Sequence, residues 1–195
     1  MGKLINRIVQ SMQITKAKPP TVAVLAAALI VLLGVGKSST AYGQFVLSST
    51  VITPNAPIAS AYSCTGADVS PPLSWNGAPV SAKSFALVVE DPDAPGGTFI
   101  HWVAYNFPAT RTSVPQGVAQ NAQIDGGGMQ GMNDFGHIGY NGPCPPRGNV
   151  HHYHFRLFAL DSTLNLDEKV DAGALEAAMK GHVVASPELV GTFSR

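Results

Sequence analysis

The sequence is poor in charged residues, which make up 12% of its 195 residues and are unevenly distributed. Five of the 12 basic residues and none of the 12 acidic residues lie in 1–43, so 44–195 has seven basic and 12 acidic residues, a net charge of −5. Nucleic acids and anionic lipid surfaces are bound by clustered Lys and Arg that neutralise phosphate charge. We therefore expect no nucleic-acid partner, and a ligand that is small or locally matched.

The short motifs of common enzymes are missing as well. The chain has no GxSxG, HExxH, CxxC or complete P-loop pattern. Cys144, seven residues before His151, is the one candidate nucleophile. We predict that the protein is not an enzyme and needs no cofactor. A hydrolase that uses Cys144 is the competing hypothesis.

The N-terminal 43 residues have the layout of an export signal. Basic residues precede a 14-residue apolar run at 22–35, and the segment ends in AYG at 41–43, with small residues at the two positions that signal peptidase reads. We predict cleavage before Gln44 and export to the periplasm or the medium. The run is shorter than the roughly 20 residues that span a bilayer, so we expect no stable membrane span after processing. An uncleaved N-terminal anchor is the alternative.

Only two cysteines are present, Cys64 and Cys144, and both lie in the predicted mature domain, 44–195. Export permits a disulfide, and closing so long a loop would stabilise the fold by roughly 4 kcal/mol in the chain-entropy model. Spacing alone leaves a bridge and two buried thiols equally open.

Strand patterns separated by turns dominate the mature domain. Apolar or aromatic runs predict strands at 45–52, 84–90, 98–107 and 151–160, and the proline-rich segment 70–75 predicts an edge strand. Residues 109–149 are rich in Gly, Pro and Asn and predict a long irregular region. Long irregular connections often carry function.

One helix is expected near the end of the chain. Asp171 suits its N-cap, Leu175 and Met179 lie on one face, and Gly181 suits its end. Together the patterns predict a mainly β protein, a two-sheet sandwich with a peripheral C-terminal helix.

Strand alternation sorts the polar side chains into faces. His151 and Tyr153 lie on one face of the last strong strand, and His152 and His154 lie on the other, so the three histidines do not form a metal site. We expect no metal.

In the preceding strand, alternation places His101 on one face with Phe99, Val103 and Tyr105. If the strands share a sheet, His101, His151 and Tyr153 can meet Asp91 at one end. Imidazole and phenol groups would then offer hydrogen-bond donors to an anion.

Several motifs in the same order resemble one known family. They are YSCTG at 62–66, SPPLSW at 70–75, DPDAP at 91–95, HW at 101–102, GYNGPCPPRG at 139–148 and HHY at 151–153. The sequence from 45 to 195 is similar to the phosphatidylethanolamine-binding protein family, in its bacterial, Raf-kinase-inhibitor-like branch.

The resemblance implies a β-sandwich whose pocket binds phosphate or a phospholipid headgroup. By matching motif, it makes Asp91, His101, His151 and Tyr153 the ligand-binding residues. Gly142, Pro143 and Cys144 lie on the rim. The family usually has His-Arg-Tyr at 151–153, but alternation directs His152 away from the pocket. The alternative function is an exported inhibitor of a protein partner, a kinase or a protease, that acts through the same rim.

Overall fold

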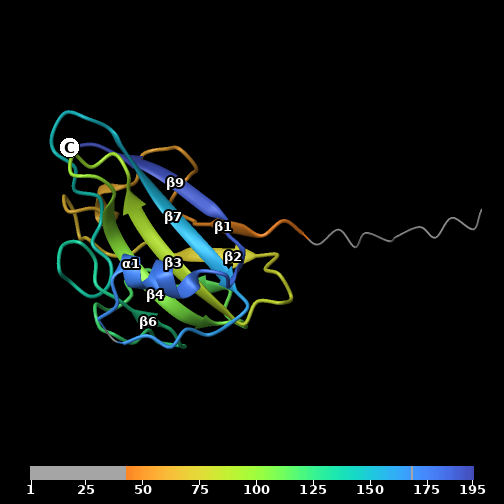
Figure 1. Cartoon of the computed structure of the whole chain (residues 1–195). Helices are drawn as coiled ribbons and strands as arrows, with labels where there is room; N and C mark the ends of the chain where they lie inside the picture. The colour runs from red at the N-terminus through yellow and green to blue at the C-terminus, as the bar shows by residue number, and fades with distance from the viewer. Residues whose placement is uncertain (1–42, 168) are drawn as a thin grey trace, which may run out of the picture. The chain divides into compact units, whose positions relative to one another are not determined.

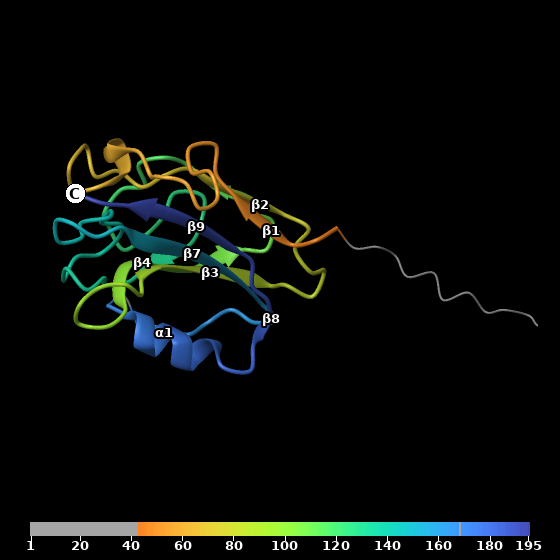
Figure 2. The ribbon, with the colours of Figure 1, turned by 90° about the horizontal axis from the view of Figure 1, so that it is seen from above.

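The computed structural model describes residues 43–167 and 169–195, and these residues belong to one compact unit. The predicted signal peptide at 1–43 therefore lies outside the described residues, apart from Gly43. Two β-sheets and one helix form three layers in this unit, with the larger sheet between the smaller sheet and the helix (Figure 2). No helix in the described part of the chain is long and apolar enough to cross a membrane.

The smaller sheet has three strands in the order β1-β2-β5, all antiparallel. The strands are β1 (Val46–Ser48), β2 (Leu73–Asn76) and β5 (Ser113–Val114). The prolines at 71 and 72 precede β2, so they do not interrupt its hydrogen bonds. The segment at 70–75 was predicted as an edge strand, and this prediction is wrong because β2 pairs on both sides.

The larger sheet has six strands and holds most of the predicted strands. Its strands are β3 (Ser84–Asp91), β4 (Phe99–Pro108), β6 (Met129–Gln130), β7 (His151–Leu160), β8 (Val183–Ala185) and β9 (Glu188–Phe193). The order is β6-β4-β3-β7, and β9 pairs with the far side of β7 (Figure 1). The short strand β8 pairs with the same side of β7. The sequence patterns did not predict β8 and β9, which follow the helix.

Alternating side chains give the larger sheet two apolar faces. One face packs against the smaller sheet, and its buried residues include Phe85, Leu87 and Phe155. The other face packs against the helix and includes Val88 and Leu160. This continuous packing on both sides is why β3 is an almost uninterrupted apolar run.

The helix α1 (Ala172–Met179) covers the second face, and the short 3₁₀ turn η1 (Ser60–Tyr62) lies in the loop after β1. The Asp171 side chain accepts a hydrogen bond from the Ala174 backbone N–H, which caps α1 at its start. Leu175 and Met179 are buried. The β-sandwich with a peripheral helix is confirmed, although two strands rather than the helix end the chain.

Candidate functional site

Three strands bring polar side chains to one end of the larger sheet. Because β3 and β4 are antiparallel, Asp91 at the end of β3 lies opposite Phe99 at the start of β4. The start of β7 lies beside the same end of β3, where Glu90 pairs with His154. This end of the sheet therefore gathers four polar side chains, those of Asp91, His101, His151 and Tyr153. The strand patterns and the motifs predicted this position. All four side chains are buried.

Asp91 holds His151 in a fixed orientation. Nδ1 of His151 lies 2.7 Å from Oδ2 of Asp91. The other carboxylate oxygen accepts a hydrogen bond from the Asp93 backbone N–H at 2.9 Å. Both Asp91 oxygens are thus occupied, and the bond to His151 selects the tautomer that carries its hydrogen on Nδ1.

His101 is held from the other side by the loop before β7. Its Nδ1 lies 2.8 Å from the carbonyl oxygen of Asn141, and the Asn141 N–H donates to the His101 carbonyl oxygen at 3.0 Å. Three aromatic rings surround the imidazole, with centroids 5.2 to 5.4 Å away: Phe99, Phe135 and Tyr153. Burial lowers the pKa of His101 below its usual value of 6.5, against the opposing effects of the Asn141 carbonyl oxygen and the Asp91 carboxylate.

A bulge in β4 aims His101 at the site. Val89 pairs with Trp102 and Glu90 pairs with Ile100, so His101 is an extra residue between the two pairs. The sequence placed His101 on one face with Val103 and Tyr105, and this prediction is wrong: Val103 and Tyr105 pack on the α1 side. Alternation fails here because the bulge shifts the register by one residue.

Tyr153 contributes a buried hydroxyl without a well-formed hydrogen bond to the protein. The side chain is fully buried, and among the described residues its hydroxyl has no hydrogen bond of good geometry, although the Asp91 carboxylate is close enough to accept weakly from it. Burial, followed by the negative charge of Asp91 and this weak hydrogen bond, raises the pKa of Tyr153. The hydroxyl therefore keeps its proton and remains a hydrogen-bond donor.

Each histidine also keeps one ring nitrogen open to solvent. Nδ1 makes the hydrogen bond of each imidazole, which leaves Nε2. Among the described residues, the buried polar side-chain atoms without a partner are Trp75 Nε1 and the Tyr153 hydroxyl. Neither Nε2 is in this set, so both Nε2 atoms reach solvent although His101 is only 2% exposed and His151 3%.

The rim residues are fixed to the loop after η1. The Gly142 N–H donates to Asp68 Oδ1 at 2.7 Å, and a Cβ at Gly142 would clash with the Tyr62 carbonyl oxygen. The Cys64 N–H donates to the Pro143 carbonyl oxygen, and Cys64 is joined to Cys144 by a disulfide with 5.4 Å between the Cα atoms. The rim is therefore held by covalent and hydrogen bonds at successive positions.

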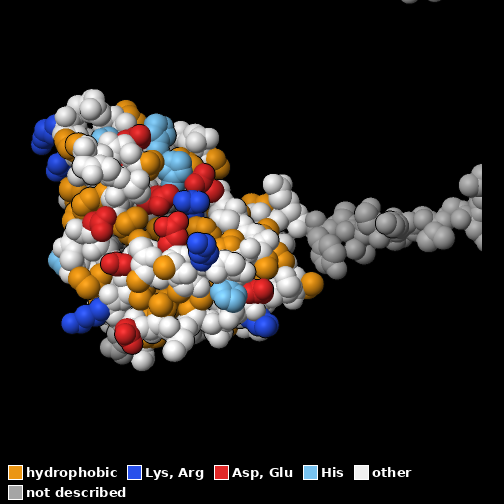
Figure 3. Space-filling view, viewed as in Figure 1, with side chains coloured by type: hydrophobic (Ala, Val, Ile, Leu, Met, Phe, Trp, Pro, Cys, Tyr) orange, Lys and Arg blue, Asp and Glu red, His pale blue; other side chains and the backbone are white. Residues whose placement is uncertain are grey.

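The outer face of β7 carries a separate set of charges. His152 pairs with Asp93 at 2.7 Å, and His154 pairs with Glu188 at 2.9 Å. Figure 3 shows acidic, basic and histidine side chains intermixed on this face. His151, His152 and His154 therefore have three different partners. No group of three or more metal-ligating side chains occurs in 43–167 or 169–195.

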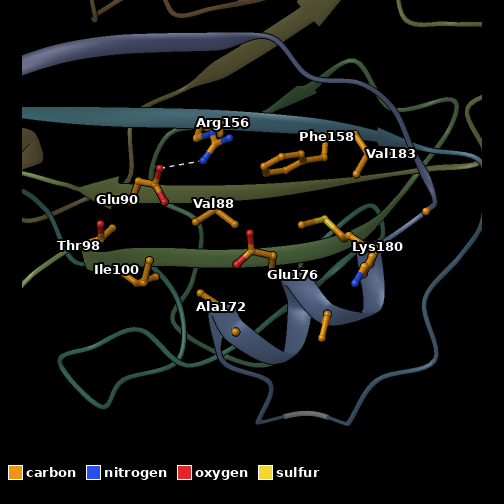
Figure 4. A pocket seen from close by; sticks show the side chains of 14 residues that line it. Val88, Glu90, Thr98, Ile100, Arg156, Phe158, Ala172, Glu176, Lys180 and Val183 are labelled. Atoms are coloured by element: carbon orange, nitrogen blue, oxygen red, sulfur yellow. Dashed lines mark hydrogen bonds and ion pairs between the residues drawn. The ribbon is translucent and has the colours of Figure 1, made fainter.

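A groove of about 920 Å³ lies between this outer face and α1. Val88 and Phe158 belong to its sheet side, and Glu176 and Lys180 to its helix side (Figure 4). None of the four clustered residues lines it. The groove and the cluster are therefore separate features of the larger sheet.

Sequence reasoning missed the loop residues that complete the surroundings. Phe135, 40% exposed, covers His101 at the surface, and Asp68 holds the rim. Arg195 donates from Nε to the Pro145 carbonyl oxygen and brings a positive charge near Tyr153. All three lie outside regular strands, so no periodic pattern could place them.

Comparison with known proteins identifies the class to which this fold and this cluster belong. The family model described as "Phosphatidylethanolamine-binding protein" matches residues 48–194. The chain belongs to the phosphatidylethanolamine-binding protein family, so the resemblance found in the sequence is confirmed.

Individual relatives agree with this membership. A UPF0098 protein of Pyrococcus horikoshii is 46% identical over 172 residues, which is 86% of each chain. A solved phosphatidylethanolamine-binding protein homologue of Chlamydia trachomatis is 41% identical and matches 77% of this chain and 97% of its own, with a TM-score of 0.71. YbcL of E. coli is 32% identical over 78% of this chain and 99% of its own, with a TM-score of 0.72.

Proposed function

We propose that this protein binds a small oxyanion, a phosphate or a phospholipid headgroup, at the end of the larger sheet. Asp91, His101, His151 and Tyr153 form the binding site, and Gly142, Pro143 and Cys144 form its rim. The observation that carries the proposal is the Tyr153 hydroxyl, a buried donor without a well-formed hydrogen bond to a protein group. An unsatisfied buried hydroxyl costs about 1–3 kcal/mol, and a bound oxyanion would remove this cost.

Two further features support a binding role. The two Nε2 atoms and the Tyr153 hydroxyl belong to one cluster, because the His101 and Tyr153 rings are in contact and Asp91 holds His151. The family name describes proteins that bind a phospholipid. We propose that the protein acts in this way outside the cytoplasm, as its N-terminal sequence predicts.

A non-catalytic role is part of the proposal. Cys144, the only candidate nucleophile found in the sequence, is joined to Cys64 and has no free thiolate. Nδ1 of His151 is bonded to Asp91, and among the described residues no hydrogen bond joins His151 Nε2 to a serine, threonine or cysteine that it could activate. The cluster therefore contains orienting and hydrogen-bonding groups without an activated nucleophile.

Thermal unfolding with and without phosphate tests the proposal. A ligand that binds only the folded state raises the melting temperature by mass action. We expect phosphate to raise the melting temperature of the wild type. Most of this increase should be absent in Tyr153→Phe. Without phosphate, Tyr153→Phe is expected to be close to the wild type in stability, because no well-formed protein hydrogen bond is lost.

Tyr105→Phe is the matched control. Tyr105 is equally buried but donates to the Asp167 carbonyl oxygen on the α1 side of the sheet. This variant should lose about 1 kcal/mol of unfolding free energy and keep the full phosphate effect. If phosphate stabilises Tyr153→Phe as much as the wild type, the site lies elsewhere.

A further inference from the structure

Negative charge dominates the surroundings of the proposed oxyanion site. The Asp91 carboxylate interacts electrostatically with both His101 and Tyr153. Two further carboxylates add negative charge: that of Asp68 near His101, and that of Asp93 near His151 and Tyr153. The positive charge facing Tyr153 is that of Arg195. Unless a histidine is protonated, a fully ionised oxyanion would enter a region that repels it.

The hydrogen bonds of the two imidazoles decide which ring nitrogen carries the hydrogen. The Asn141 carbonyl oxygen can only accept, so the hydrogen of neutral His101 is on Nδ1. The Asp91 carboxylate has the same effect on His151. Each neutral ring therefore presents a bare Nε2 to solvent, as an acceptor. Burial lowers the pKa of His101, which favours its neutral form.

Two other titratable side chains beside the cluster are engaged with protein groups, and Arg195 is held by its Nε to the Pro145 carbonyl oxygen. The Tyr140 hydroxyl donates to the Tyr62 carbonyl oxygen at 2.7 Å, and Nδ1 of His137 is engaged with Oδ1 of Asn141. With neutral imidazoles, the four clustered side chains themselves offer one donor, the Tyr153 hydroxyl, and two acceptors. A fully ionised oxyanion has acceptors only, so it does not match this set.

We propose that the ligand supplies the missing hydrogen: the site selects a tetrahedral oxyanion that carries an acidic hydroxyl, as the monoanion of a phosphate monoester does. The ligand hydroxyl donates to Nε2 of a neutral histidine, and an ionised ligand oxygen accepts from the Tyr153 hydroxyl. An oxyanion without such a hydrogen binds only when the site takes up a proton. This inference rests on the proposed function and adds the protonation state of the ligand.

Methyl phosphate and methyl sulfate separate the two cases. At about pH 5.5, most methyl phosphate is a monoanion with one hydroxyl, because its second pKa is about 6. Methyl sulfate has the same charge and a similar size but no hydroxyl. Dimethyl phosphate, also without a hydroxyl, represents the phosphodiester of a phospholipid headgroup. Calorimetry in two buffers of different ionisation enthalpy gives the affinity and the protons taken up.

We expect methyl phosphate to bind about tenfold more tightly than methyl sulfate or dimethyl phosphate, the value of one hydrogen bond to a charged ligand. When either ligand without a hydroxyl binds, the site should take up about one proton. The affinity for these two ligands should then fall about tenfold for each pH unit above the pKa of the protonated histidine. His101→Asn or His151→Asn should abolish the preference for methyl phosphate, since one of these Nε2 atoms accepts the ligand hydrogen.

Equal affinities for the three ligands, without proton uptake, would overturn this inference and leave the proposed function intact. The inference also fails, and the proposed function again stands, if both histidine variants keep the tenfold preference. If none of the three ligands binds between about pH 5 and about pH 8, where imidazole changes charge, both the proposed function and this inference fail.

Discussion

Nδ1 of His151 and Oδ2 of Asp91 lie 2.7 Å apart, with both side chains only 4% exposed. Nδ1 of His152 lies at the same distance from Asp93, but there the side chains are 51% and 42% exposed. Consecutive histidines on β7 therefore make the same contact on opposite faces, one inside the protein and one in solvent. This arrangement offers a matched comparison.

The first prediction uses this comparison. Asp91→Asn weakens a buried charge-assisted hydrogen bond and should lower the unfolding free energy by about 1–3 kcal/mol. Asp93→Asn changes an exposed pair that solvent screens, and should cost about 0–1 kcal/mol. Urea unfolding at neutral pH measures both. A larger loss in Asp93→Asn would contradict the assignment of the buried pair as the structural one.

The second prediction concerns acid. Burial lowers the pKa of His101, so the folded protein binds fewer protons there than the unfolded chain. The unfolding free energy should therefore fall as the pH drops from 6.5 towards the folded pKa, and this contribution should be constant above 6.5.

His101→Asn provides the test, because it removes this proton-linked contribution. Its unfolding free energy should decrease less than that of the wild type between about pH 7 and about pH 5. Denaturant unfolding at a series of pH values gives the two slopes. Equal slopes would show that His101 does not lose proton affinity on folding.

The third prediction concerns the disulfide. Cys64 and Cys144 are separated by 80 residues, and the bridge holds the rim against the loop after η1. Cys64→Ser with Cys144→Ser should lower the unfolding free energy by roughly 4 kcal/mol, the chain-entropy value for such a loop. A reducing agent should lower the melting temperature of the wild type and leave the double variant unchanged. An equal effect on both proteins would mean that the reductant acts elsewhere.

The sequence predicted the strands of the site well because their patterns are local. β7 spans His151–Leu160 as expected, and its alternation holds because its register with β3 is unbroken. In β4 the pattern failed, since bulges beside His101 and at Asn106, where φ is +56°, depend on the partner strand. A bulge leaves no periodic signal in a strand that is apolar on both faces.

The position of the four site residues had two sources. Alternation placed His151 and Tyr153 together, and a shared sheet was expected to bring them to Asp91 and His101. The family motifs then made the same four residues the ligand-binding set. Loop residues such as Phe135 and Asp68 could not be placed, because their contacts depend on the three-dimensional course of the 109–149 region and of the loop after η1. The disulfide was an open question in the sequence because spacing does not give a Cα separation.

The fourth prediction concerns the N-terminal segment. Expression of the full chain in a bacterium with a general secretory pathway should give a mature protein that begins at Gln44, outside the cytoplasm. N-terminal sequencing of the protein from the periplasm or the medium measures this. Protein that is recovered there and still begins at Met1 would reject cleavage and favour the anchor.

Oxyanion binding at the end of the larger sheet can be observed directly in a crystal structure of the protein with phosphate. We expect an anion with one oxygen within about 3 Å of the Tyr153 hydroxyl and another at Nε2 of His101 or His151, beside the Gly142–Cys144 rim. Phosphate bound away from all three atoms, or this end of the sheet filled by a protein side chain, would contradict the proposed site.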